Sequence, residues 1–293
     1  MATDDNARFG YLPYTFSIVG VQKAGTSTLA KLLAKHQLIS KAPTKELHFF
    51  DDETRDWGHP DYSEYRCPKR QPWHVHAGDA TPVYLFWPRA LERMRAYNPE
   101  MKLIASFRDP IERAFSQWSM GRGWFKGYPE FHDVINDRRP ESLPADLPDE
   151  SPIHFRRRAL ISRGYYGAQL RRGLESFDRD QWLLFDFHRI FADFDKTLDA
   201  MTDFLGLPRF AEHPEVRRKM ASPTGLTGTA PTPDDIAGLA EMYAKDLAEL
   251  TELSGLDVSD WPTSKILDGT LDPADLAEKL TRKAGLAAEV AAE

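Results

Sequence analysis

The stretch that most constrains the fold is an apolar run followed by a glycine-bounded turn near the N-terminus. Residues 14–20, YTFSIVG, form a short β-branched run that predicts a buried strand. The turn 20–25, GVQKAG, follows, and leucines then recur at helical spacing over 29–33, which predicts a helix from about Thr26. A strand, a glycine-containing turn and a helix in this order are typical of the first unit of an α/β nucleotide-binding fold.

A second strand and helix repeat this pattern further along the chain. The run 101–107, MKLIASF, predicts a strand, and the helix after it has Asp109 as its expected N-cap and Pro110 at its first position. Apolar residues at helical spacing, from Ile111 to Trp118, mark the buried face of that helix. We expect further strands in 74–86, interrupted at Thr81–Pro82, and in 181–187, and helices over 165–177, 192–205 and 234–254.

The alternation of strands and helices predicts the fold class. Strands that are each followed by a helix form parallel sheets, because a helix returns the chain to the same edge. We therefore expect an α/β fold, a P-loop-like three-layer sandwich in which helices flank a central, mostly parallel β-sheet.

Charge and cysteine content narrow the function classes. A net charge of −7 argues against a nucleic-acid partner, since such proteins are usually basic. The single cysteine, Cys67, excludes an intramolecular disulfide and a cysteine-based zinc cluster, and it fits a reducing compartment. The N-terminus lacks the pattern of a secretory signal and no apolar run approaches membrane-spanning length. We expect a cytoplasmic protein without a membrane partner.

The turn after the first strand is a candidate anion site. Residues 20–28, GVQKAGTST, keep the glycine spacing of a P-loop, but Thr26 stands where the P-loop lysine belongs and Lys23 lies inside the loop. Backbone N–H groups at a helix N-terminus attract anions, Lys23 adds a positive charge, and the hydroxyls of Thr26, Ser27 and Thr28 add donors. The alternative is an ordinary turn with a solvated lysine.

Two residues of the second strand–helix unit are further candidates. Arg108 follows the strand directly, at the end where open α/β sheets bind ligands. Ser116 lies two turns into the following helix. The alternatives are that Arg108 forms a salt bridge with Asp109 or Glu112, and that Ser116 is a small residue tolerated on a helix face.

Four runs, in this order along the chain, carry a resemblance to a known family. They are GVQKAGTSTL (20–29), KELHFFD (45–51), DATPVYL (79–85) and FRDPIERAFSQW (107–118). Together they resemble the sulfotransferases that use 3′-phosphoadenosine-5′-phosphosulfate (PAPS), most of all the heparan sulfate N- and O-sulfotransferase branch and its bacterial relatives. The run 164–187 looks like a helix–strand unit of the same branch, so that the resemblance covers roughly residues 16–262.

The resemblance implies PAPS as co-substrate and its 3′,5′-bisphosphate, PAP, as product. It implies that the first turn binds the 5′-phosphosulfate and that Arg108 and Ser116 hold the 3′-phosphate. A sulfuryl group carries less charge than a phosphoryl group, so we expect no metal requirement. The cofactor-binding residues carried over are Lys23, Ala24, Gly25, Thr26, Ser27, Thr28, Arg108, Ser116 and Tyr166.

The resemblance also implies which residues take part in catalysis. It places a general base on Glu46, while Lys23 and Lys45 would neutralise charge that develops on the leaving phosphate. His48 stays open as an alternative base, or as a packed residue that orients the site. Asp79 occupies an acceptor-side position in the resemblance, but the lysine that many relatives carry next to it is replaced by Ala80.

The acceptor is the least defined part of the expected reaction. We expect residues 1–262 to form the sulfotransferase domain, with 121–160 inserted on the acceptor side and 263–293 as a C-terminal helical tail. The run 217–231 stands where related enzymes carry a Lys-Gly-Arg loop. The expected acceptor is a hydroxyl, less readily an amine, of a small or carrier-bound molecule. Candidate walls of the acceptor pocket are Trp57, Tyr62, Trp73, Tyr84, Trp124 and Tyr165.

Two other function classes remain open from the sequence. A P-loop-type small-molecule kinase would require ATP and Mg²⁺, yet the lysine of GxxxxGK is missing at Thr26. A catalytically inactive nucleotide- or anion-binding module would keep Lys23 and Arg108 without needing Glu46.

Overall fold

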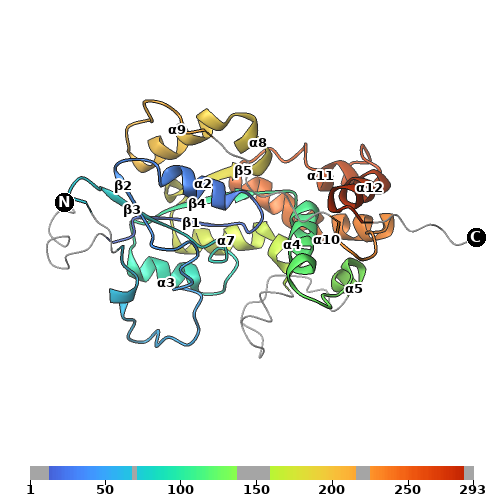
Figure 1. Ribbon diagram of the computed structural model, residues 1–293, viewed down its shortest axis with the longest axis horizontal. Helices are drawn as coiled ribbons and strands as arrows, with labels where there is room; N and C mark the ends of the chain where they lie inside the picture. Colours follow the sequence, from blue (N-terminus) through green and yellow to red (C-terminus); the bar gives the residue numbers. More distant parts are fainter. Residues whose placement is uncertain (1–12, 68–70, 137–158, 216–224, 287–293) are drawn as a thin grey trace, which may run out of the picture. The chain divides into compact units, whose positions relative to one another are not determined.

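The computed structural model describes residues 13–67, 71–136, 159–215 and 225–286, and the chain divides into two units (Figure 1). The first unit comprises residues 1–107 and 172–216, and the second comprises residues 108–171 and 217–293. The boundary falls between Phe107, which ends a strand, and Arg108, which leads into a helix.

A five-stranded sheet forms the centre of the first unit. Its strands are β1 (Phe16–Gly20), β2 (Ile39–Lys41), β3 (His76–Ala80), β4 (Lys102–Phe107) and β5 (Trp182–Asp186). They lie in the order β2-β3-β1-β4-β5, and every neighbouring pair is parallel. All five residues of β1 are buried, as expected of a central strand covered on both faces. The predicted parallel sheet is confirmed, and among the strands that the structure describes, the sequence patterns missed the three-residue β2.

Helices cover both faces of this sheet. On one side lie α2 (Thr26–Leu33), α8 (Phe187–Ala192) and α9 (Phe194–Leu205), and α3 (Ala90–Tyr97) lies on the other (Figure 1). Leu29 and Leu32 of α2 pack with Ile18 of β1 and with Leu198 and Met201 of α9 in one apolar cluster. The expected three-layer, P-loop-like sandwich is therefore confirmed. Short 3₁₀ turns at Tyr62–Glu64 and Arg179–Gln181 complete the unit, and α7 (Tyr166–Ser176) is shared between the two units.

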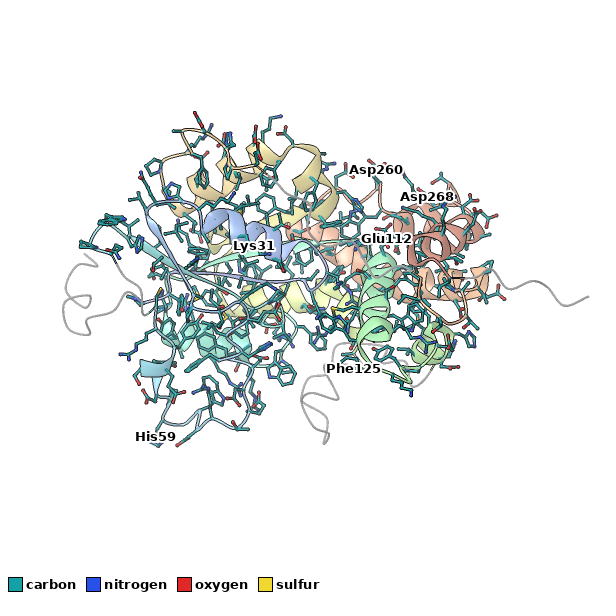
Figure 2. The ribbon with its side chains drawn as sticks, viewed as in Figure 1. Lys31, His59, Glu112, Phe125, Asp260 and Asp268 are labelled. Carbon is teal, nitrogen blue, oxygen red and sulfur yellow. The ribbon has the colours of Figure 1, made fainter. Side chains whose placement is uncertain are left out.

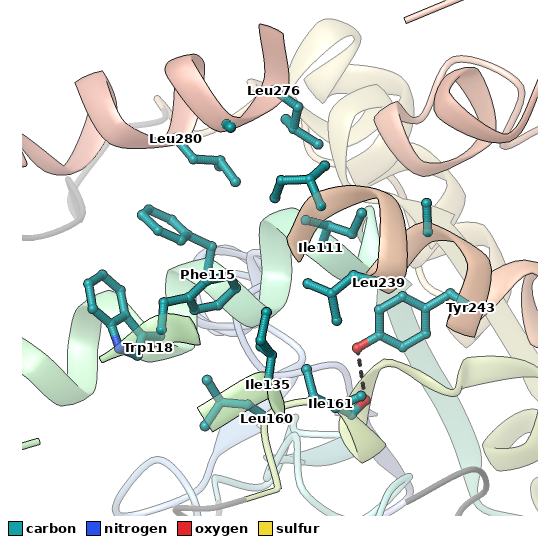
Figure 3. Packing of buried hydrophobic residues seen from close by; sticks show 14 of the residues in the cluster. Ile111, Phe115, Trp118, Ile135, Leu160, Ile161, Leu239, Tyr243, Leu276 and Leu280 are labelled. Atoms are coloured by element: carbon teal, nitrogen blue, oxygen red, sulfur yellow. Dashed lines mark hydrogen bonds between the residues drawn. The ribbon is translucent and has the colours of Figure 1, made fainter. Parts of the chain in front are cut away.

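The second unit is helical. Besides the first turns of α7 and a 3₁₀ turn at Ser162–Gly164, it contains α4 (Pro110–Trp124), α5 (Phe131–Asn136), α10 (Pro233–Ser254), α11 (Pro262–Leu267) and α12 (Pro273–Ala284). Its core joins the apolar face of α4 to α10 and α12, and Figure 3 shows Phe115, Leu239 and Leu280 pointing into it. The phenol of Tyr243 donates to the carbonyl oxygen of Ile161 at 2.9 Å, within the same core.

The start of α4 confirms its expected cap. The side chain of Asp109 accepts from the backbone N–H of Glu112 at 2.9 Å, and Pro110 occupies the first helical turn. The second carboxylate oxygen of Asp109 accepts from the backbone N–H of Thr263 at 2.7 Å, which ties α4 to the start of α11. Asp109 is therefore a structural residue of the second unit.

Several sequence expectations fall outside what the structure describes. Most of the 121–160 insert and the basic part of 217–231 belong to the stretches 137–158 and 216–224, which lie outside the described residues. The domain limits 1–262 and 263–293 stay a prediction. In the described part of the chain, no helix combines the length and apolar character that crossing a bilayer requires.

Candidate functional site

The turn after β1 is fixed to the carboxyl edge of the sheet. The backbone N–H of Val21 donates to the carbonyl oxygen of Ser106 on β4 at 2.9 Å, and the Ser106 hydroxyl donates to the carbonyl oxygen of Ala24. A Cβ on Gly20 would lie 2.7 Å from the Leu85 side chain, so glycine is required by that close approach. Ligands of open parallel sheets bind at this edge.

The residues that follow Gly20 bring together the predicted anion donors. Gly25 caps α2 with a left-handed backbone, φ 80°, and an added Cβ would meet the Phe187 ring at 3.2 Å. Lys23 also adopts a left-handed backbone, φ 75°, which is uncommon for a residue with a side chain and is typical of functional turns. Ala24 and Thr26 are buried, while Ser27 and Thr28 are partly exposed in the first turn of α2.

The segment that carries Glu46 is anchored on β3, the strand next to β1. The backbone N–H of Glu46 donates to the carbonyl oxygen of Ala80 at 3.1 Å, and that of Leu47 donates to the Thr81 hydroxyl at 3.0 Å. Glu46 and His48 both have left-handed backbones, with φ of 61° and 53°. Each such residue costs on the order of 1–3 kcal/mol, so the anchoring contacts hold an unfavourable local conformation in place.

Two side chains, Lys45 and His48, lie beside the Glu46 carboxylate. The Lys45 ammonium donates to one carboxylate oxygen, and the His48 Nε2 lies 3.7 Å from the other. His48 Nδ1 lies 2.9 Å from the Asp51 carboxylate; because a carboxylate only accepts, Nδ1 donates this bond. Hydrogen bonding from His48, followed by Lys45, lowers the pKa of Glu46 to about 2 against the opposing effect of burial. Glu46 is therefore ionised at neutral pH.

Asp79 supports this segment from inside β3. It is 1% exposed and accepts from the Ala80 backbone N–H at 2.6 Å, the Tyr65 phenol at 3.1 Å and the Thr81 hydroxyl at 3.1 Å. Because the same Thr81 oxygen accepts from Leu47, Asp79 helps to orient the backbone next to Glu46. Burial raises the pKa of Asp79 to about 6.

We expect Asp79→Asn to flatten the dependence of stability on pH. The Asp79 carboxyl has a pKa of about 6 in the native protein and an ordinary pKa of about 4 in the unfolded chain. Between these two pH values the native state therefore binds more protons than the unfolded state. The free energy of unfolding of the natural protein consequently falls as pH rises through this range. The predicted loss is on the order of 2–3 kcal/mol between pH 4 and 7. Urea unfolding at several pH values measures it. Asp246 also has a pKa of about 6 and contributes equally to the natural protein and to Asp79→Asn. The difference between their two slopes of unfolding free energy against pH therefore belongs to Asp79, and equal slopes would contradict the prediction.

In the second unit, Arg108 lies in a buried ion-pair cluster. It is 5% exposed, and its guanidinium Nη2 and Nε lie 3.1 and 3.3 Å from one carboxylate oxygen of Glu112. The Lys279 ammonium lies 3.0 Å from the other oxygen of Glu112, which Figure 2 labels on α4. The Arg108–Glu112 salt bridge named as an alternative therefore exists, while Asp109 serves as the helix cap.

Ser116 and Tyr166 lie in the same unit. Ser116 is 7% exposed and lines a small pocket together with Glu112, one helical turn before it. Tyr166 is 1% exposed; burial raises its pKa, and its phenol interacts electrostatically with Arg113, Asp109 and Arg108. Arg113 is fully buried and donates to Gln117 and to the carbonyl oxygen of Leu160, so that it supports the packing of α4.

The expected aromatic walls separate into three kinds by exposure, and Trp57 and Tyr62 are half-buried. Tyr84 and Tyr165 are buried in the cores of their units, and Tyr84 accepts from the Phe49 backbone N–H at 3.0 Å. Trp73 and Trp124 are 57% and 69% exposed. Of the predicted walls, these two tryptophans present the most ring surface to solvent.

Comparisons with known proteins agree with this fold and these motifs. The family model described as "Sulfotransferase domain" matches residues 14–222. The human heparan sulfate glucosamine 3-O-sulfotransferase 3B1 is 30% identical over 192 residues, which are 66% of this chain and 46% of that protein. The membrane-associated sulfotransferase kil1 of Dictyostelium discoideum is 31% identical over 114 residues, 38% of this chain and 24% of that protein.

A solved structure extends the comparison to most of the chain. The sulfotransferase from Alicyclobacillus acidocaldarius is 25% identical, with a TM-score of 0.67, and the match covers 85% of this chain and 98% of that one. The chain spans about half the length of the human relative, 46%. The family match over 14–222 is nevertheless long and includes the turn after β1, the Glu46 segment and the start of α4. The chain belongs to the sulfotransferase-domain family.

Proposed function

We propose that the protein transfers the sulfuryl group of PAPS to a hydroxyl acceptor and releases PAP. The observation that carries the proposal is the ionised Glu46, held beside Lys45 in the segment anchored on β3, which pairs with the strand β1 that leads into the Lys23 turn. A kinase would need a lysine where this chain has Thr26.

Each unit, taken by itself, contains donors suited to one phosphate-bearing group of PAPS. In the first unit, the positive charge of Lys23, the backbone from Ala24 to Gly25 and the hydroxyls of Thr26, Ser27 and Thr28 suit the 5′-phosphosulfate. In the second unit, Arg108, Ser116 and Tyr166 suit the 3′-phosphate, since a guanidinium matches two phosphate oxygens at once.

In the proposed reaction Glu46 acts as general base. Its carboxylate takes the proton of the acceptor hydroxyl while the acceptor oxygen forms a bond to sulfur. The bond from sulfur to the bridging oxygen breaks, and PAP leaves with that oxygen and its electron pair. Lys45 and Lys23 stabilise the negative charge that develops on the leaving phosphate.

The Lys45–Glu46 pair bears directly on this chemistry. A carboxylate with a pKa of about 2 is a weak base, and the best base has a pKa near the working pH. A phosphosulfate competes with Glu46 for the Lys45 ammonium, and loss of that partner raises the pKa of the carboxyl. Binding of PAPS would thus raise the pKa of Glu46 before it takes the proton of the acceptor.

His48 is proposed to orient the site. Its Nδ1 bond to the buried Asp51 fixes the ring and directs Nε2 toward Glu46. The role of second candidate base stays open for His48, because Nε2 is partly exposed at the same carboxylate.

The acceptor is proposed to be a hydroxyl of a small or carrier-bound molecule. The name of the human relative specifies O-sulfation, which supports a hydroxyl over an amine. The exposed rings of Trp73 and Trp124 suit an apolar or ring-bearing acceptor. A cytoplasmic location stays a prediction.

Calorimetry with PAP and with ATP, both without metal, tests the proposal. We expect PAP to bind and ATP to bind at least tenfold more weakly, because ATP has no 3′-phosphate for Arg108 and Ser116. Tight binding of ATP with no binding of PAP would support the kinase alternative instead. Incubation with labelled PAPS and a panel of hydroxyl and amine acceptors then separates an enzyme from an inactive binding module.

A further inference from the structure

The pocket beside Ser116 has a wall that lies outside the family match. Glu112, Phe115, Ser116 and Ser119 of α4 line one side of it. Leu280, Lys283 and Ala284 of α12 line the other. The matched residues end at 222, whereas α12 spans Pro273–Ala284, so these three residues lie outside the part of the chain that the family model matches.

Packing determines which side of α12 faces this pocket. Leu276, Ala277, Leu280 and Ala284 recur at helical spacing and are buried in the core of the second unit. Figure 3 shows Leu276 and Leu280 directed toward the side of α4 that carries Phe115. Lys279 and Lys283 are one helical turn apart on the flank of this apolar stripe, so their ammonium groups lie on the same side of the helix.

The pocket contains two hydrogen-bond donors that have no partner among the described residues. The Ser116 hydroxyl makes no hydrogen bond to any residue the structure describes, and it lines the pocket. Within the same described ranges, the Lys283 ammonium makes neither a hydrogen bond nor an ion pair. A hydroxyl and an ammonium at one small pocket suit an anion with several acceptor oxygens.

The charges around the pocket also favour an anion. Arg108, Lys279 and Lys283 contribute three positive charges, against one negative charge on Glu112, to which Arg108 and Lys279 are bonded. The pKa of Lys283 is lowered mainly by desolvation, and also by the positive charges of Arg108 and Lys279. The negative charge of Glu112 acts in the opposite direction. The positive charges of these three side chains outnumber the negative charge of Glu112, which suits a phosphomonoester because its charge above the second pKa is about −2.

We propose that Lys283 of α12 is a further binding residue for the 3′-phosphate of the nucleotide, acting with Arg108 and Ser116. The proposal rests on the proposed function, because it takes PAPS and PAP as the ligands. Lys279 has a supporting role: it neutralises the second oxygen of Glu112, so that this buried carboxylate does not repel the phosphate. The C-terminal helix thereby helps the protein to distinguish 3′-phosphorylated nucleotides from those without a 3′-phosphate.

The test compares two ligands that differ only in the 3′-phosphate, PAP and adenosine 5′-phosphate, by calorimetry on the full chain. Lys283→Gln is expected to weaken PAP binding by about tenfold or more and to leave adenosine 5′-phosphate binding unchanged. Lys283→Arg keeps the charge and should retain PAP affinity within about threefold. Arg282→Gln is the matched control, since Arg282 is 74% exposed on the same helix turn, and it should change neither affinity.

The outcomes separate this proposal from the proposed function. Failure of the natural protein to prefer PAP over adenosine 5′-phosphate would overturn both. A natural protein that prefers PAP, together with a Lys283→Gln variant of equal PAP affinity, would overturn the role of Lys283 alone. Equal weakening of both ligands would also overturn it, because the effect would then be general. Thermal unfolding of each variant verifies that α12 stays folded.

Discussion

Replacing Glu46 by glutamine is expected to lower the turnover number by about 100-fold to 10,000-fold and to leave PAP affinity nearly unchanged. The substitution keeps the size of the side chain but removes the carboxylate that we propose takes the acceptor proton, and general-base assistance is worth about that much. Steady-state rates at saturating PAPS, combined with calorimetry against PAP, measure the two quantities. Glu64→Gln is the matched control, because Glu64 is 61% exposed and forms its ion pair with Arg55, away from Glu46 in the sequence.

Unchanged turnover in Glu46→Gln would remove Glu46 as the base and direct attention to His48. The pH dependence of kcat/KM for PAPS, which reports the groups of the free enzyme, then distinguishes the two residues. With a pKa of about 2, Glu46 is ionised throughout the range above about pH 4, so a rate that depends on it shows no acid limb there. A base of ordinary imidazole pKa, about 6.5, loses activity as pH falls through that value. Because Asp79 titrates near 6, the profile should also be measured in Asp79→Asn.

Replacing Arg108 by alanine is expected to weaken PAP binding by about 2–4 kcal/mol, or roughly 30-fold to 1,000-fold. Arg108 is 5% exposed and is the arginine of the RDP run at 108–110. Binding of adenosine 5′-phosphate should change far less, since it has no 3′-phosphate. Calorimetry with both nucleotides measures the difference.

The Arg108→Ala result needs a control for the partner that it leaves behind. Glu112 is 3% exposed and would lose its ion pair with Arg108 while it keeps the one with Lys279, so part of any loss could come from an unbalanced buried carboxylate. The double variant Arg108→Ala with Glu112→Gln removes that carboxylate. If the double variant recovers PAP affinity, Arg108 stabilises α4 and does not bind the 3′-phosphate. If Arg108→Ala weakens acceptor binding alone, the 3′-phosphate site is elsewhere.

Local signals in the sequence were sufficient for the sheet and for the start of α4. The run 16–20 is apolar because β1 is buried on both faces, and the Asp109–Pro110 pair is a cap that depends only on neighbouring residues. The strand β2 has three residues and gives no periodic pattern, so it was missed. Elements defined by residues close in the chain were predictable, and those defined by a distant partner were not.

The candidate site shows the same limit. Glu46 and His48 have left-handed backbones because Ala80 and Thr81 anchor the segment, and no local glycine pattern announces this. The Lys279 contact with Glu112 spans 167 positions of the chain. Helical periodicity indicates that α12 has an apolar stripe, but only the packing of that stripe determines where its lysines lie.

The helical core of the second unit has a practical consequence for dividing the chain. A fragment cut where the family match ends, at residue 222, would retain α4 and lose α10, α11 and α12. The apolar face of α4 would then be exposed to solvent and would favour aggregation. Its residues Ile111, Phe115 and Trp118 are each at most 3% exposed in the whole protein. The smallest useful fragment of this protein therefore extends through α12, well past the boundary that family membership alone would suggest.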